Sequence, residues 1–415
     1  MDKLNSWTPF TIKEIGKVVT GKTPSTKVPD YFGGEYPFIT PTDMDGRKII
    51  VQTERTISEA GKKVLPSYLL PSKSVCVSCI GWQMGKVVMT GKPSFTNQQI
   101  NSIIPKAHII PDFLYYSLST RREELKALGY VGVRTPILNK SSFEKITIQI
   151  PPIETQQRIA AILSAYDDLI ENNTRRIQIL EEMARRIYEE WFVRFRFPGH
   201  ENVRMIESEL GLIPDGWQIV SFTEIADVLS GGTPKTTEPA YWDGDISFFA
   251  PKDISPSFFV VETEKKITEL GLRRCNSRLY DEKTIFITAR GTVGKVTLPA
   301  SPMAMNQSCY ALKGKNGINH LFLFMATIDL AAHLKKKASG ATFDAIVVDT
   351  FRSQRTIKPL SVLIDKYSIT VKPMFSEMLN LLKRNQVLRT TRDLLLPKLI
   401  SGEIDVSNFP EPLSD

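Results

Sequence analysis

Apolar side chains recur with alternating spacings of four and three residues along two long stretches of the chain. The first stretch runs from 153 to 192 without glycine or proline, and the second lies 208 residues further on. This heptad pattern predicts a long helix in each stretch, with one apolar seam along its length. The seam positions that we assign to helix pairing are Ile159, Leu163, Tyr166, Ile170, Asn173, Ile177 and Leu180 in the first stretch and Met374, Met378, Leu381, Asn385, Leu388 and Leu395 in the second.

The two stretches belong to two copies of one long sequence unit. Residues 20–44 and 230–254 are identical at ten of 25 positions at an offset of 210, and the match continues at offsets of 209 and 208. A repeat of this length indicates a duplicated domain rather than a solenoid of short repeats. The chain is therefore predicted to be pseudo-symmetric, with two similar surfaces.

Neither predicted helix can bury its seam alone in water, so each needs a partner. Forty residues of helix span roughly 60 Å. A pseudo-two-fold axis between the copies predicts that the two helices pair with each other as an antiparallel coiled coil. Asn173 and Asn385 are the polar residues of the two seams near mid-helix. We hypothesise that they meet, form a hydrogen bond and fix the register of the pair.

Each copy begins with about 140 residues rich in glycine, proline, threonine and short β-branched runs. Strands are predicted at 73–80, 86–91, 145–150, 284–289 and 295–300, and a helix at 112–128. The fold class is thus mixed α/β, with two such domains that are each followed by a long helix. The predicted segments are domain 1 at 1–150, helical spacer 1 at 151–197, a connector at 198–215, domain 2 at 216–358, helical spacer 2 at 359–402 and an acidic tail at 403–415.

Composition narrows the class of protein. The 415 residues are 42% hydrophobic and 24% charged, which is typical of a folded protein and excludes a disordered or collagen-like chain. The longest apolar run, 321–332, contains Asp329 and is too short to span a bilayer. The first residues do not resemble a signal peptide, and four cysteines give no disulfide framework. We therefore expect a cytoplasmic protein that has no membrane partner.

Charge favours a polyanionic partner. The chain carries a formal net charge of +8, and residues 1–150 alone hold 20 Lys/Arg against 12 Asp/Glu. Residues 216–358 hold 18 against 14, so each predicted domain is basic. Two basic domains fit two surfaces that bind nucleic acid.

Polar residues in the predicted loops suit double-stranded DNA. Hydroxyl and ammonium groups bind phosphates, whereas Arg, Asn and Gln read base edges in the major groove. The candidate DNA-binding residues of the first copy are Lys22, Thr23, Ser25, Lys27, Trp82, Gln83, Lys86, Asn97, Gln98 and Arg134. Those of the second copy are Lys235, Thr236, Thr237, Lys252, Arg290, Lys295, Asn306, Gln307 and Thr342. Each of these residues has the alternative interpretation of an ordinary loop residue that satisfies a turn.

Three motifs suggest bond chemistry, but their surroundings do not support it. Residues 16–23 match the phosphate-binding G-x-x-x-x-G-K-T pattern, yet Pro24 follows at once and the second copy lacks the lysine. Cys76 and Cys79 form a lone CxxC without the further ligands of a zinc site. Asp112, Glu124 and Lys126 resemble scattered nuclease residues but lie in a helical pattern. We therefore predict no catalytic residue and no metal site.

The chain resembles the specificity subunits of type I restriction–modification systems over essentially its full length. The resemblance rests on IPPIETQQRIAAILSAYDDLIENNTRRIQILEEMARRIYEEWFV (150–193), ESELGLIPDGWQ (207–218), LRTTRDLLLPKLISGEIDV (388–406) and the duplicated segments GKTPSTKVPDYF and GGTPKTTEPAYW. It implies that domains 1 and 2 are target recognition domains that each recognise one half of a split DNA sequence. It also implies that the paired helices set the gap between the halves.

The resemblance further implies the partners and where the cofactors bind. The helical region would dock two methyltransferase subunits that bind S-adenosylmethionine and methylate adenine N6. Restriction subunits would add ATP- and Mg-dependent translocation and cleavage, and the specificity subunit itself would bind no cofactor. Two alternatives stay open: a free-standing DNA-binding coiled-coil scaffold, and a P-loop ATPase that depends on Lys22.

Overall fold

The computed structural model describes residues 7–130, 136–337 and 345–407. The candidates Arg134 and Thr342 lie outside these residues. The chain divides into two compact units, and each contains parts of both long helices. Unit 1 comprises residues 1–170 and 387–415, and unit 2 comprises residues 171–386. This grouping follows contacts rather than the sequence repeat, so the segment boundaries given above stay predictions.

Unit 1 is a mixed α/β body built on two small sheets. A five-stranded sheet has the order β2-β9-β6-β7-β4, a three-stranded sheet has the order β5-β3-β8, and β1 pairs with β10. The strands are β1 Thr8–Thr11, β2 Gly16–Thr20, β3 Phe32–Ile39, β4 Ile49–Ile50, β5 Thr56–Ile57, β6 Val75–Ser78, β7 Val87–Thr90, β8 Phe95–Thr96, β9 Ile100–Pro105 and β10 Thr147–Ile150. The helices are α1 Ile12–Ile15, η2 Pro29–Tyr31, α2 Glu59–Val64, η3 Pro66–Tyr68, α3 Pro111–Ser119, α4 Arg122–Gly129 and α5 Lys140–Glu144.

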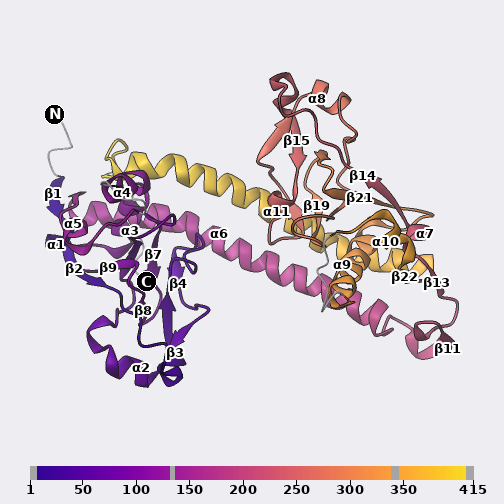
Figure 1. Cartoon of the computed structure of the whole chain (residues 1–415), viewed down its shortest axis with the longest axis horizontal. Coiled ribbons are helices and arrows are strands. Elements are labelled where there is room, and N and C mark those ends of the chain that lie inside the picture. Colours follow the sequence, from indigo (N-terminus) through magenta and orange to yellow (C-terminus); the bar gives the residue numbers. More distant parts are fainter. Residues whose placement is uncertain (1–6, 131–135, 338–344, 408–415) are drawn as a thin grey trace. The chain divides into compact units, whose positions relative to one another are not determined.

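Unit 2 repeats this topology. Its five-stranded sheet has the order β14-β21-β18-β19-β16, its three-stranded sheet has the order β17-β15-β20, and β13 pairs with β22. The strands are β11 Met205–Ser208, β12 Gly211–Pro214, β13 Gln218–Ser221, β14 Ala226–Ser230, β15 Trp242–Phe249, β16 Phe259–Val260, β17 Lys265–Ile267, β18 Ile285–Thr288, β19 Val296–Pro299, β20 Met303–Met305, β21 Cys309–Gly314 and β22 Arg355–Lys358. The shorter helices are η5 His200–Asn202, α7 Phe222–Ile225, η6 Pro239–Tyr241, η7 Pro251–Asp253, α8 Glu269–Arg273, α9 His320–Lys337 and α10 Val348–Ser353. In each unit the five-stranded sheet lies nearer to a long helix than the three-stranded sheet does (Figure 1).

The long helices are α6, Ile153–Tyr188, and α11, Ser361–Ile400; a π-helical turn, η4, Glu189–Val193, ends the first. In unit 1, Ile159 and Leu163 of α6 share a buried cluster with Leu399 of α11. In unit 2, Ile177 and Ala184 of α6 share a buried cluster with several residues of α11. Within unit 2, Asn173 contacts Asn385 and Arg176 contacts Glu377, so positions further along α6 meet earlier positions of α11 and the helices run antiparallel there.

The helix pair and the sheets share one core in each unit. In unit 1, Phe113 and Leu114 of α3 and Val75 of β6 lie in the same cluster as Ile159. Burying a large apolar side chain contributes about 1.5–3 kcal/mol. The seam therefore stabilises the sheet domain as well as the helix pair. No helix in the described part of the chain has the length and the hydropathy that a membrane span requires.

All five predicted strands are confirmed within a few residues, and the helical stretch predicted at 112–128 is confirmed as two helices rather than one. The structure has α3 and α4 there, separated by Thr120 and Arg121. The hydroxyls of Ser119 and Thr120 donate to the carbonyls of Tyr116 and Ser117. Side chains that bond the backbone locally in this way compete with the helical ladder. The apolar period cannot reveal this local competition.

Repeated glycines mark places where two backbones touch. A Cβ on Gly21 would lie 2.2 Å from the carbonyl oxygen of Asn97, and one on Gly231 would lie 2.1 Å from that of Asn306. The two pairs of residues correspond in the two copies. Both copies therefore have glycine here because the neighbouring backbone leaves no room for a side chain.

We expect Gly21→Ala to destabilise unit 1 by about 1–3 kcal/mol, because the new methyl group overlaps backbone that cannot move independently. Gly231→Ala should do the same in unit 2. Urea unfolding followed by circular dichroism measures both effects. Ser25→Ala, in the exposed part of the same loop, is the control and should leave the unfolding midpoint unchanged. A wild-type midpoint for Gly21→Ala would contradict the close-packing explanation.

Candidate nucleic-acid interface

One edge of the five-stranded sheet in unit 1 collects the loops that carry most of the candidates. Strands β2, β9, β6 and β7 are antiparallel neighbours. The ends of β2 and β6 and the starts of β9 and β7 therefore meet at the same edge. We call the loop 21–28, the turn 79–86 and the loop 97–99 together edge 1.

Hydrogen bonds hold the three segments of edge 1 together. The hydroxyl of Thr23 donates to Oε1 of Gln98 at 2.7 Å. The amide of Lys22 donates to the carbonyl of Thr96 at 2.9 Å, and that of Cys79 donates to the carbonyl of Gln99 at 2.7 Å. Segments that are up to 78 residues apart (99 − 21) in the sequence thus form one surface.

Unit 2 builds the same arrangement, which we call edge 2: the loop 231–238, the turn 289–295 and the loop 306–308. The hydroxyl of Thr233 donates to Oε1 of Gln307, as its counterpart does in unit 1. The amide of Ala289 donates to the carbonyl of Ser308 at 2.7 Å. The duplication has therefore kept the scaffold of the edge.

Many predicted candidates are exposed on these edges. The structure brings them together although the chain separates them widely. The exposed candidates of edge 1 are Lys22, Ser25, Lys27, Trp82 and Gln98, and those of edge 2 are Lys235, Thr236, Thr237, Arg290, Lys295 and Gln307. Thr23 and Gln83 are half-buried.

Other candidates serve the scaffold instead. Asn97 is 9% exposed, accepts from the amide of Gln99 and donates to its side chain. Asn306 accepts from the amide of Ser308 in the same way. Side-chain amides that are engaged in this way shape the loop. Asn97 and Asn306 are therefore left out of the interface proposed below.

Two candidate lysines have partners within the protein. Nζ of Lys86 donates to the carbonyl of Met44 at 2.7 Å and to Oε1 of Gln83 at 3.0 Å, which ties two loops together. Lys252 forms an ion pair with Glu264 at 2.5 Å, and both side chains are largely exposed. Such an exposed pair contributes little to stability and can open toward a phosphate. Lys252 therefore stays a candidate, whereas Lys86 is a structural residue.

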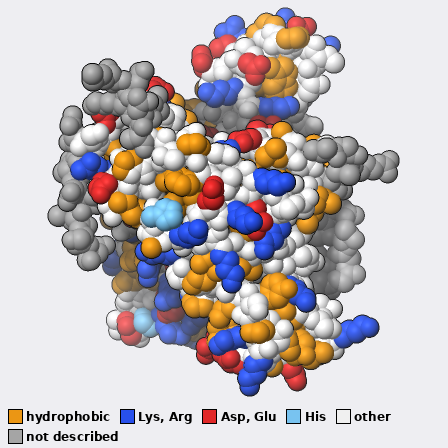
Figure 2. All heavy atoms as spheres, turned by 90° about the vertical axis from the view of Figure 1, so that its left-hand side faces the viewer, with side chains coloured by type: hydrophobic (Ala, Val, Ile, Leu, Met, Phe, Trp, Pro, Cys, Tyr) orange, Lys and Arg blue, Asp and Glu red, His pale blue; other side chains and the backbone are white. Residues whose placement is uncertain are grey.

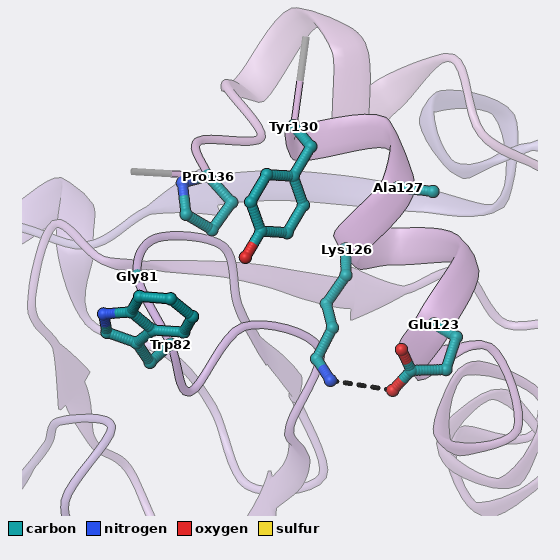
Figure 3. A pocket seen from close by; sticks show the side chains of 7 residues that line it. All are labelled: Gly81, Trp82, Glu123, Lys126, Ala127, Tyr130 and Pro136. Atoms are coloured by element: carbon teal, nitrogen blue, oxygen red, sulfur yellow. Dashed lines mark hydrogen bonds and ion pairs between the residues drawn. The ribbon is translucent and has the colours of Figure 1, made fainter. Parts of the chain in front are cut away.

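Trp82 is the most exposed large apolar side chain among those described, at 84%. Gly81 and Gly85 have positive φ angles, so the turn between β6 and β7 is tight and holds the indole outward. Figure 3 shows the phenol of Tyr130, at the end of α4, between this indole and Lys126. Lys126 is paired with Glu123 at 2.7 Å. The shallow pocket therefore offers aromatic surface beside charged groups.

Sequence reasoning missed a group of arginines beside edge 2. Arg273, at the end of α8, and Arg274 and Arg278, after it, are exposed, and Arg274 lines a shallow pocket together with Thr233 and Gln307. The segment LRRCNSR (272–278) carries three arginines in seven residues, which was the available signal. On the face shown in Figure 2, basic side chains are interspersed with acidic and apolar ones. Charge alone therefore does not outline an interface.

The residues of the motifs that suggested bond chemistry have structural roles in the part of the chain that the structure describes. Gly16 begins strand β2, and Lys22 lies 5.6 Å from the ring of Tyr68, so residues 16–23 do not form a phosphate loop that opens a helix. Asp112 pairs with Lys48, and Glu124 pairs with Arg121. The candidate nuclease residues thus have separate partners.

The CxxC cysteines belong to the core. Cys76 and Cys79 are buried in different apolar clusters, as expected for thiols on opposite faces of a sheet. Burial raises the pKa of each thiol to about 12, so neither is a thiolate at neutral pH. Within the ranges that the structure describes, no cluster of His, Cys, Asp and Glu is suited to a metal ion.

Comparison with known proteins identifies the family. Residues 5–182 and 214–360 match the model of the type I restriction modification DNA specificity domain. The type I restriction enzyme MjaIX specificity subunit of Methanocaldococcus jannaschii is 31% identical over 412 residues, which cover 97% of this chain and 94% of that protein. The HindI specificity subunit of Haemophilus influenzae is 41% identical over 150 residues, which cover 36% of this chain and 32% of that protein.

A solved structure shares the fold. The crystal structure of a type I restriction–modification S subunit from M. genitalium aligns over 95% of this chain and 96% of that one, with a TM-score of 0.61 and 17% identity. At this identity the likeness concerns the fold alone. The family model matches most of the chain, and a relative is 31% identical along nearly its whole length; the chain therefore belongs to the specificity subunits of type I restriction–modification systems.

Proposed function

We propose that edge 1 and edge 2 each recognise one half of a bipartite DNA sequence, within the DNA-recognition role of the specificity-subunit family. The repeated edge is the observation that carries this proposal, because the same scaffold presents different exposed side chains in the two units. In this proposal, residues 1–150 and 216–358 are the two target recognition domains. The family role is recognition, and catalysis belongs to partner subunits.

The chemistry of the edges supports DNA as the ligand. Lys22, Ser25 and Lys27 on edge 1 are exposed groups of the kind that bind phosphates and fix register. Arg290 and Gln307 on edge 2 are of the kind that read guanine and adenine. Edge 1 has Trp82 and edge 2 has the nearby arginines, so the two half-sites should differ in sequence.

The partners follow from the family. We infer that the paired helices dock two methyltransferase subunits, which would bind S-adenosylmethionine, and that restriction subunits would supply the ATP- and Mg-dependent steps. This chain would then bind no cofactor and act on DNA in the cytoplasm. A free-standing DNA-binding scaffold is the alternative that the experiments below distinguish.

The helix pair would also set the gap between the half-sites. A helix rises about 1.5 Å per residue, and one strand of DNA rises about 3.4 Å per base. Helix length and gap length are therefore linked if α6 and α11 form a continuous coiled coil between the two recognition domains. The contact between Asn173 and Asn385 supports this proposal, because it shows which segment of α11 lies beside a given segment of α6.

Modification-sensitive sequencing tests the function as a whole. Cells that carry the cognate methyltransferase subunit should gain a new N6-methyladenine motif, with two halves and a fixed gap, only when this chain is also present. The control is the same strain with an empty vector. No new motif, although the two proteins co-purify, would contradict the recognition proposal. No motif and no co-purification would favour the free-standing scaffold.

Substitutions on the two edges should act on different half-sites. Trp82→Ala should relax base preference in one half and Arg290→Ala in the other, each with a loss of about 1–3 kcal/mol in binding. Lys22→Ala should weaken binding to all sequences and reduce the salt slope by about 1. These effects are measured by fluorescence anisotropy, with the complex of this chain and the methyltransferase subunits bound to DNA duplexes that carry single base changes.

Two lysines provide matched controls for those substitutions. Lys17 lies at the start of β2 and Lys313 near the end of β21, both at the sheet edge opposite to the candidate edges. Lys17→Ala and Lys313→Ala remove the same charge and should leave affinity and salt slope unchanged. If they weaken binding as much as Lys22→Ala does, the edges are not the interface.

Shortening both helices tests the ruler. Deleting 171–177 from α6 and the matching 381–387 from α11 removes one heptad and both seam asparagines together. The loss of about 10 Å of helix corresponds to about three base pairs of gap. Sequencing of the methylated motif should show a shorter gap between unchanged half-sites. An unchanged gap would refute the ruler proposal.

A further inference from the structure

Two buried polar pairs join α6 to α11. In unit 2, Nδ2 of Asn173 donates to Oδ1 of Asn385 at 2.9 Å, and the two residues are 8% and 1% exposed. Nδ2 of Asn385 also donates to the hydroxyl of Thr174 at 3.2 Å. The asparagines therefore satisfy each other across the seam.

In unit 1, Arg392 of α11 donates to Oδ1 of Asp167 of α6 at 2.5 Å, and both side chains are mostly buried. The other oxygen of Asp167 accepts from the hydroxyl of Tyr116 at 2.5 Å. Nζ of Lys48 completes the network, with Oδ1 of Asp112 at 2.5 Å and the hydroxyl of Tyr116 at 3.3 Å. Burial and the nearby Asp167 carboxylate raise the pKa of Tyr116, which keeps its hydroxyl protonated as a donor.

The second copy of the sequence has apolar residues at the positions of these groups. At the offset of 208, which aligns the sequences of the two helices, each residue of these two polar pairs is aligned with an apolar residue of the other copy. The corresponding pairs are Asp167 and Phe375, Asn173 and Leu381, Ile177 and Asn385, and Ala184 and Arg392. No polar seam pair is thus repeated by the duplication.

Unit 2 fills the place of the charged network with aromatic rings. Phe258 aligns with Lys48 at the offset of 210, and Phe324 aligns with Tyr115 at 209. Phe258, Phe324 and Phe375 pack against one another with ring centroids 5.0–5.8 Å apart. The same junction between sheet and helix therefore holds a charged network in unit 1 and an aromatic cluster in unit 2, where the buried carboxylate of Glu181 accepts from the amide of Phe258 at 2.7 Å.

This asymmetry has a consequence for pairing between like halves of two copies of the chain. In a pair of two α6 helices, Asp167 would face Ala184 and Asn173 would face Ile177. In a pair of two α11 helices, Arg392 would face Phe375. A buried polar group without a partner loses its hydrogen bonds with water and gains none in return. In pairs of like halves, Asp167 would keep the hydroxyl of Tyr116 and Arg392 would keep Asp393, but the polar contacts across the seam would be lost, and each loss would occur twice.

We propose that the Asn173–Asn385 and Asp167–Arg392 pairs make the helix seam selective for unlike halves, so that each half pairs with the other half and rejects the like half of a second copy. Without them both seams would be apolar, and contacts between apolar side chains are less selective for a partner than a buried polar pair is. The selectivity does not depend on DNA or on the proposed recognition function. A single buried polar pair is known to specify partners in this manner at a cost in stability.

Nicking the full-length chain after it has folded tests the proposal. A protease site inserted between the exposed Glu201 and Asn202 separates the two halves while both stay in place, and it leaves the β11–β12 hairpin whole in the second half. The nicked protein is unfolded in urea and refolded, and native mass spectrometry counts unlike and like pairs. Random pairing gives equal amounts of the two classes. We expect like pairs to fall at least roughly tenfold below that share.

A symmetrised variant provides the comparison. Asp167→Phe, Asn173→Leu, Asn385→Ile and Arg392→Ala give each polar seam residue the identity of its counterpart in the other copy. In this variant, like pairs should rise toward half of the total. If the wild type pairs at random, or if the variant pairs as selectively as the wild type, the proposal is overturned.

A control and a second measurement complete the test. Arg176 and Glu377 also form an ion pair between the helices, but their side chains are 51% and 37% exposed, so water screens the pair and Glu377→Ala should not change the pairing. On the intact chain, Arg392→Ala should lower the urea midpoint more than the double variant Asp167→Phe with Arg392→Ala. The single change leaves the mostly buried carboxylate of Asp167 with the hydroxyl of Tyr116 but without its cation. Additive midpoint shifts would contradict the proposal even if the nicked halves fail to refold.

Discussion

The structure depends on one constraint, which is that neither long helix can bury its apolar seam alone. In unit 1 the seam residues of α6 and α11 lie in the same buried cluster as α3 and β6, and in unit 2 they lie with the sheet and α9. Helix pairing and domain folding therefore share one core in each unit. A change in the seam should affect the sheet domain that packs on it as well as the helix pair.

Duplication preserved the scaffold of the edges more closely than their exposed surface. The contacts between Thr23 and Gln98 and between Thr233 and Gln307 correspond, and Gly21 and Gly231 are both confined by neighbouring backbone. The exposed Trp82 has no counterpart in the shorter turn of unit 2. A fixed frame with variable side chains is the arrangement that lets one fold present two different recognition surfaces.

Sequence patterns predicted the long helices because burial on one face imposes a period on the residues. They predicted the strands from short β-branched runs between turn residues, and β6, β7 and β18 are indeed buried at every position. At 112–128 the pattern predicted helix correctly but did not show the break at Thr120 and Arg121, where the hydroxyls of Ser119 and Thr120 bond the local backbone. At the site, repetition suggested Asn97 and Asn306 as contacts, but both shape their loops. Arg274 was missed because its place beside Thr233 depends on the fold of the loops and on no spacing in the chain.

The seam also shows why stability alone does not explain its polar residues. A buried ion pair such as Asp167 and Arg392 must overcome the loss of hydration of both charges, and apolar replacements often leave a protein equally stable. Unit 2 supplies that apolar solution with Phe375 and its aromatic neighbours at the equivalent junction. The chain thus contains both solutions, one in each copy. Their difference is what distinguishes the two halves, because the remaining seam positions are apolar in nearly every turn of both helices.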